Sequence, residues 1–113
     1  MSLPFTDAIV MLNAKTTTST SEAFDVSKRQ QMTIQFIATG VTVFTVDASN
    51  DGANWITGVA FLDAKQTASA TYVVSKSLSA TTEGAIITPG FRYIRVVATV
   101  TNGTATALLE CAG

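Results

Sequence analysis

The residues of this 113-residue chain that could do chemistry are few and scattered. There is no histidine, one cysteine at Cys111, and eight carboxylates spread along the chain. Without histidine the usual base for acyl transfer is missing, and no two carboxylates fall on one face of a predicted strand as an acid and base pair. Cys111 has no histidine neighbour to generate a thiolate, so we expect a buried structural thiol. The sequence therefore predicts a protein that is not an enzyme and that needs no cofactor.

One segment could bind a metal ion. Oxygen ligands of the kind that Ca²⁺ prefers are offered by Asp47, Asn50, Asp51 and Asn54. The segment lacks a glutamate at the spacing of an EF-hand loop, and a sequence rich in Asn, Asp and Gly is what a tight turn requires. We therefore expect a turn here and no metal site.

Three further residues could bind a partner through their side chains. Trp55 follows this turn and could stack on a sugar ring, although a lone tryptophan at the start of a strand is more often buried in the core. Tyr93 and Arg95 are two residues apart, so both project from one face of a strand and could form a cation–π or intersubunit contact. Arg92 falls on the opposite face, which excludes an anion clamp made by both arginines.

The composition indicates a surface with little charge. Charged residues make up 13% of the chain, against roughly a quarter in ordinary soluble domains. Threonine is used 19 times, and the net charge is −1. Such a chain has no positive field to hold nucleic acid or an anionic membrane, so we expect neither as a partner. A surface with so few charges gives little electrostatic repulsion between molecules. We therefore expect the exposed faces of this protein to be covered by other subunits.

The elements that would position these residues are short alternating strands. Residues 31–38 and 41–48 each alternate apolar and polar side chains, and Thr39-Gly40 between them predicts a hairpin. A second hairpin is predicted with Asn50-Asp51-Gly52 as its turn and residues 55–61 as the returning strand. Turn signals every ten or so residues are typical of a β-sandwich.

The longest predicted strand covers residues 92–100, and the dipeptide Asn102-Gly103 after it favours a type I′ turn into a strand at residues 104–111. The whole pattern predicts an all-β fold, a single antiparallel β-sandwich of about eight or nine strands with Greek-key or jelly-roll-like connections. The residues expected in its core include Phe44, Trp55, Ile94 and Val96.

Three motifs also carry a resemblance to a known class of protein. They are Ser49-Asn50-Asp51-Gly52-x-x-Trp55, Phe91-Arg92-Tyr93-Ile94-Arg95-Val96 and Asn102-Gly103-Thr104-Ala105-Thr106. Over residues 41–111 the chain resembles the small β-sandwich virion proteins of tailed bacteriophages. Carbohydrate-binding sandwiches, including discoidin-like ones, use the same turn and strand.

The resemblance implies a structural protein of the virion, acting as a capsid decoration, head-fibre or tail-associated module. Its expected partners are other virion proteins, such as the major capsid protein. Together with the low charge, this predicts a homo-oligomer, such as a trimer, that is made in the host cytoplasm and located in the virion.

We expect one domain over residues 1–113, with an extended N-terminal arm at residues 1–7. The arm and the polar loop at residues 16–21 have no evident role in a core, so both are expected to contact partners. The residues expected to bind are Leu3, Pro4, Phe5, Trp55, Tyr93 and Arg95. The alternative is a carbohydrate-binding or adhesion module that uses Trp55 and adjacent loops, which would require an exposed Trp55 ring.

Overall fold

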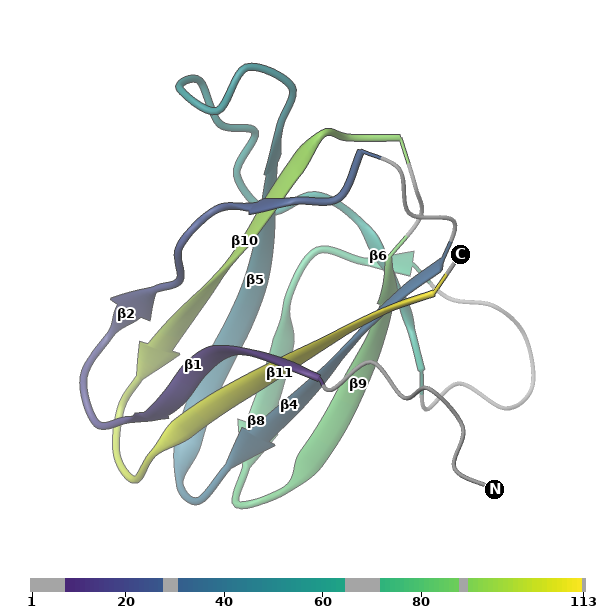
Figure 1. Cartoon of the computed structure of the whole chain (residues 1–113). Coiled ribbons are helices and arrows are strands. Elements are labelled where there is room, and N and C mark those ends of the chain that lie inside the picture. The colour runs from purple at the N-terminus through teal and green to yellow at the C-terminus, as the bar shows by residue number, and fades with distance from the viewer. Residues whose placement is uncertain (1–7, 28–30, 65–71, 88–89, 113) are drawn as a thin grey trace, which may run out of the picture.

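Eleven strands form two sheets that pack face to face (Figure 1). The computed structural model describes residues 8–27, 31–64, 72–87 and 90–112. All strand pairs in it are antiparallel. The predicted antiparallel β-sandwich is therefore confirmed. The described strands outnumber the eight or nine predicted because three of them are only two residues long.

The two sheets share the strands as follows. The six-stranded sheet has the order β1 (Ile9–Lys15), β11 (Ala105–Ala112), β4 (Gln31–Ala38), β9 (Thr82–Ile87), β6 (Phe61–Asp63) and β7 (Tyr72–Val73). The five-stranded sheet has the order β2 (Ser19–Thr20), β10 (Tyr93–Val100), β5 (Val41–Ser49) and β8 (Lys76–Ser79), and β3 (Phe24–Asp25) also pairs with β10.

Four of the connections that cross between the two sheets form a group. They join β1 to β2, β4 to β5, β8 to β9 and β10 to β11, and all lie at the lower end of the sandwich in Figure 1. The order β1-β11-β4-β9 in one sheet matches the order β2-β10-β5-β8 in the other, position by position. Each of these connections therefore joins a strand to the strand that faces it across the core. This is the strand arrangement of a jelly roll. We call these four connections the arches.

Two arches replace predicted hairpins. The strands on either side of Thr39-Gly40, and those on either side of Asn102-Gly103, belong to different sheets and do not pair with each other. The reason is burial, because the apolar faces of β4 and β5 meet across the core, where the rings of Phe36 and Phe44 stack with centroids 4.5 Å apart. Backbone pairing comes from other strands, since β4 pairs with β11 and β5 pairs with β10.

The two central arches touch through glycine. A Cβ added to Gly103 would lie 2.7 Å from the Cα of Gly40, and a Cβ added to Gly40 would lie 2.7 Å from the carbonyl carbon of Asn102. Neither distance is possible for a real Cβ atom without movement of the backbone. Gly103 also has a φ of +74°, a conformation that favours glycine. The close approach of the two arches therefore requires glycine at both positions.

Hydrogen bonds join the arches into a continuous row. The Ala80 amide donates to the Gly40 carbonyl oxygen at 3.0 Å, and the Val41 amide donates to Oδ1 of Asn102 at 2.8 Å. The Thr104 amide donates to Oγ1 of Thr39 at 2.7 Å. Three neighbouring arches thus satisfy one another's backbone groups, which irregular backbone must do when it packs closely.

The core between the sheets confirms three of the four predicted buried residues. Phe44, Ile94 and Val96 are fully buried, and Phe61 contacts the edge of the Phe36 ring. Trp55 was expected in the core and is instead half-buried, because it lies in the loop after β5 on the outer side of the five-stranded sheet. Cys111 is half-buried and packs against the core.

The edge of the sandwich beside β8 is bridged by charged side chains. Nζ of Lys76 lies 2.7 Å from Oδ2 of Asp63 and 3.7 Å from Oε1 of Glu83, both in the opposite sheet. The hydrogen bond that Nζ donates to Asp63, together with the negative charges of both carboxylates, raises the pKa of Lys76. A lysine that points inward from an edge strand also hinders pairing with another chain.

Other predicted elements differ in detail. Residues 55–61 do not form a regular strand returning along β5, since Ile56 makes an isolated bridge to Ala48 and Phe61 already belongs to β6 in the other sheet. A positive φ at Gly58 turns the chain away, and the Gly58 amide donates to a side chain instead of a strand. The polar loop at residues 16–21 contains the short β2 and ends at Ser21, whose buried hydroxyl accepts the Val96 amide. The predicted arm, residues 1–7, lies outside the described residues.

Replacement of Gly103 by alanine tests the contact between the arches. The added methyl group would combine a strained φ with a steric overlap, so Gly103→Ala is expected to cost about 3 kcal/mol of unfolding free energy. Gly52→Ala is the matched control, because Gly52 has a similar φ of +76° but only ordinary contacts with the Tyr93 ring. It is expected to cost about 1 kcal/mol. Chemical denaturation measures both, and equal losses would show that the close approach carries no cost.

Removal of a buried hydroxyl is expected to raise the unfolding free energy, whereas Gly103→Ala is expected to lower it. Thr42 is fully buried, and its Oγ1 has no hydrogen-bond partner among the described residues. Thr42→Val keeps the shape and removes the unsatisfied group, so it is expected to raise the unfolding free energy by up to about 1 kcal/mol. Thr99→Val, on the exposed face of β10, should change it little. A clear loss of stability in Thr42→Val alone would mean that a bound water satisfies the hydroxyl.

Candidate functional site

The residues singled out from the sequence meet at the upper end of β5 and β10. In the register of these two strands Tyr93 lies opposite Ser49, and Arg95 lies opposite Asp47. The turn after β5 then places Trp55 above the same outer face of the sheet. The structure thus brings together Trp55, Tyr93 and Arg95. Leu3, Pro4 and Phe5 lie outside the described residues.

The turn at residues 49–54 is held by its own side chains. Oδ1 of Asp51 accepts the amides of Ala53 and Asn54 at 2.9 and 2.8 Å, and its Oδ2 accepts Nδ2 of Asn54 at 2.9 Å. These bonds, led by the one from the Asn54 side chain, hold the pKa of Asp51 well below its usual range. The buried hydroxyl of Ser49 accepts the Gly52 amide at 2.9 Å. Among the residues that suggested calcium, Asp51 thus caps the amides of its own turn, while Oδ1 of Asn50 accepts the Arg92 amide.

Tyr93 supports this turn from below. Its ring lies 3.5 Å from the position that a Cβ on Gly52 would take, which places the turn directly on the ring. The guanidinium carbon of Arg92 lies 5.2 Å from the centre of the same ring. Arg92 also pairs with Asp25 at 3.7 Å, with both side chains about half exposed. Tyr93 therefore has a structural role in holding the turn.

Trp55, Arg95 and Asp47 form a connected chain of side chains. The guanidinium carbon of Arg95 lies 4.2 Å from the centre of the Trp55 ring, and Nε of Arg95 donates to Oδ2 of Asp47 at 3.0 Å. The Gly58 amide donates to Oδ1 of Asp47 at 3.1 Å. The Asp47 side chain is only 4% exposed. Because Arg95 covers one face of the Trp55 ring, that face is not available to stack on a sugar.

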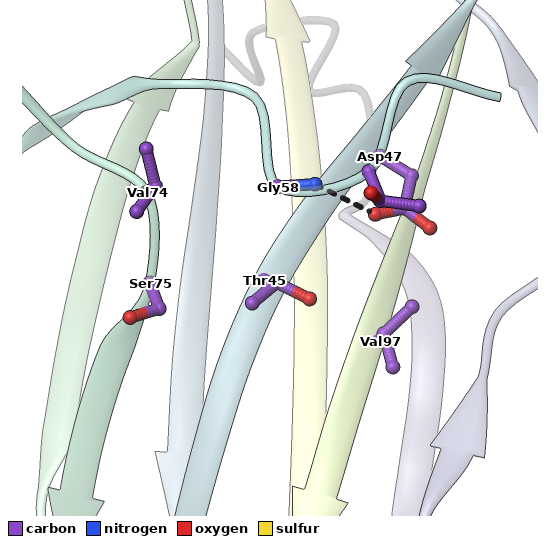
Figure 2. Close-up of a pocket in the computed structure, with 7 residues that line it drawn as sticks. Thr45, Asp47, Gly58, Val74, Ser75 and Val97 are labelled. Carbon is purple, nitrogen blue, oxygen red and sulfur yellow. Dashed lines mark hydrogen bonds between the residues drawn. The ribbon is translucent and has the colours of Figure 1, made fainter.

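An open groove of about 490 Å³ lies beside this chain on the outer face of the five-stranded sheet. Figure 2 shows Val74 and Ser75 on one side of it, Thr45 in the middle, and Asp47 and Val97 on the other side. Thr57 and Gly58 complete the lining. Trp55 and Arg95 are not part of this lining. They affect the groove by holding the Asp47 side chain in place.

Sequence reasoning missed the groove and the role of Asp47. Asp47 was considered only as a metal ligand, because the pattern places it on the outer face of the strand, where a carboxylate in water needs no partner; in the structure it is buried and does need one. That partner is Arg95, 48 residues later in the chain. The pairing depends on the register of β5 and β10, which alternation within each strand does not fix.

The described residues contain no group of three His, Cys, Asp or Glu side chains placed to hold a metal ion. No helix in this part of the chain is long and apolar enough to cross a membrane.

Comparison with known proteins gives a likeness of fold only. No protein-family model matches the chain, and no curated protein is significantly similar to it in sequence. Among solved structures, the chain is similar to the crystal structure of the SPBc2 prophage-derived protein YomS, with a TM-score of 0.81 and 12% identity. The match covers 100% of this chain and 97% of that one. It shows that the whole chain shares its fold with that protein.

The ion pair beneath Trp55 can be tested by removing Arg95. Arg95→Met keeps an aliphatic side chain against Trp55 and leaves the buried Asp47 carboxylate without its cation, so we expect a loss of about 2–3 kcal/mol in unfolding free energy. Arg92→Met is the matched control, because its pair with Asp25 is exposed and should contribute little. Emission of Trp55, the only tryptophan, can report both unfolding curves. Equal effects of the two substitutions would contradict the assigned role of Asp47.

Proposed function

We propose that this chain is a non-enzymatic structural protein of a phage virion that decorates or stabilises the capsid through repeated protein–protein contacts. The observation that carries the proposal is the similarity of fold, over the whole chain, to a prophage-derived protein. The jelly-roll arrangement is used by viral capsid domains, and also by lectins and cupins. Because a fold hosts many functions, the surface must support the choice among them.

Most of the positive charges in the described part of the chain are paired with carboxylates of the same chain. Arg95 pairs with Asp47, Arg92 with Asp25, and Lys76 with Asp63. Little unpaired positive charge is left in the described part of the chain, which disfavours a nucleic acid or an anionic membrane as partner. A face without strong charge is suited to contact with other protein subunits.

The outer face of the six-stranded sheet provides such a contact area. Tyr72, Leu62 and Ile86 lie side by side in the register of β7, β6 and β9. Tyr72 and Ile86 are exposed, and Leu62 is half-buried. Thr33 and Glu110 continue the same row across β4 and β11. We call the three residues Tyr72, Leu62 and Ile86 the apolar row.

Repetition would supply the affinity that one such contact lacks. A small apolar patch gives weak binding by itself, whereas copies arranged by symmetry on a particle bind together with an increased effective concentration. On this proposal the protein acts as a homo-oligomer, such as a trimer, on a lattice of major capsid protein in the virion. It would bind the lattice more tightly than it binds single coat subunits.

Sedimentation with particles that lack this chain tests the proposal. The full chain is expected to saturate the particles in a fixed ratio and to raise the temperature at which they rupture, while binding free coat subunits weakly. Ile86→Asp places a charge in the apolar row and should weaken particle binding on the order of tenfold. Thr99→Asp, on the exposed face of the other sheet, should leave it unchanged.

Two results would overturn the proposal. One is equal affinity for free subunits and for particles, which would exclude a mechanism based on repetition. The other is the absence of any binding to coat protein in either form. Binding that Thr99→Asp weakens and Ile86→Asp does not would move the contact to the opposite sheet and contradict the apolar row.

A further inference from the structure

The groove on the outer face of the five-stranded sheet has features that the proposed function does not use. Its volume of about 490 Å³ falls within the range of roughly 300–1,000 Å³ that is typical of small-molecule sites. Thr45 and Val97 come from β5 and β10, Thr57 and Gly58 from the loop that folds back over the sheet, and Val74 and Ser75 from the crossing between β7 and β8. Two strands, a loop and a crossing between the sheets therefore build it.

The charge in the groove selects against ionic ligands. Among the described residues of the lining, Asp47 is the only ionisable one, and Arg95 compensates its charge from behind. An anionic ligand would meet a carboxylate, and a cationic ligand would have to compete with an arginine already in place. A neutral ligand encounters neither obstacle.

The polar groups in the groove have unused hydrogen-bonding capacity. Each oxygen of Asp47 receives one hydrogen bond from the protein, at 3.1 Å from Gly58 and 3.0 Å from Arg95. A carboxylate offers about four acceptor positions, so it can still take donors from a ligand. The hydroxyls of Thr45, Thr57 and Ser75 make no hydrogen bond with the described residues, and each can donate and accept.

A ligand that matches this lining must carry several hydroxyl groups and some apolar surface. Val74, which is 59% exposed, and Val97 provide aliphatic contacts between the polar groups. A pyranose ring combines hydroxyl donors with patches of C–H surface, and it has no charge. We propose that this groove binds a neutral saccharide, with Asp47 as the acceptor and the Thr45 hydroxyl as a specificity contact.

In this assignment Trp55 and Arg95 are positioning residues. Arg95 is held against the Trp55 ring and fixes the orientation of the Asp47 carboxylate, while neither residue touches the ligand. The saccharide site differs from a platform that stacks a sugar directly on Trp55. It is also separate from the apolar row, which belongs to the other sheet.

A printed array of neutral and sialylated oligosaccharides, probed with the full chain, identifies the class of ligand. The neutral oligosaccharide with the strongest signal is then titrated into ¹⁵N-labelled protein. Amide shifts are expected at Thr57, Gly58 and Ser75, because the Gly58 amide is bonded to the Asp47 carboxylate that accepts the sugar hydroxyls. The sialylated form of the same sugar is expected to bind more weakly.

Two matched substitutions locate the site. Thr45→Val removes one hydroxyl from the groove and should weaken binding by about three- to tenfold. Thr99→Val makes the same change outside the groove and should leave the affinity unchanged. The proposal is overturned if no neutral oligosaccharide on the array binds, if the shifts lie outside the groove, or if Thr45→Val binds as well as the parent chain. This test needs no particles, so its failure leaves the proposal of capsid binding intact, and the reverse also holds.

Discussion

The contact between the arches at Gly40 and Gly103 decides how the rest of the chain is arranged. When the chain crosses between sheets at both points, β4 faces β5 and β10 faces β11. The crossing at Ala80 joins this row through its hydrogen bond to Gly40. Each strand joined to another by an arch then buries its apolar side against that strand, and its backbone pairs with strands that are not its neighbours in the sequence. The jelly-roll order follows from that single choice.

This arrangement leaves the two sheets with different outer faces. The loop after β5 folds back over the five-stranded sheet, where Arg95 and the Gly58 amide hold the buried carboxylate of Asp47. In the described part of the chain, the apolar row on the outer face of the six-stranded sheet stays accessible, with Tyr72 and Ile86 exposed. One face is therefore shaped into a groove with unused polar groups, and the other presents an apolar area. The two proposals assign a different kind of partner to each.

Alternation within strands was enough to predict the β-sandwich and the burial of Phe44, Ile94 and Val96, because side chains in a strand point alternately to the two sides. It could not predict the arches, since a short Thr-Gly or Asn-Gly segment between two such strands suits a hairpin as well. Only the contact of Gly40 with Gly103, residues distant in sequence, separates the two cases. Alternation within one strand also placed Tyr93 and Arg95 on the same face. The pairing of Arg95 with Asp47 depends on the register between two strands, so it could not be foreseen.

Hydrogen exchange in the native protein tests most directly whether the arches hold the two sheets together. The amides of Val41, Ala80 and Thr104 are bonded from one arch to another and lie at one end of the sandwich. If the arches are the structural basis of the fold, these amides should exchange as slowly as Phe44 and Val96 in the core strands, through global unfolding only. Exchange of the three amides at the rate of the 50–54 turn, while the core strands stay protected, would contradict this account.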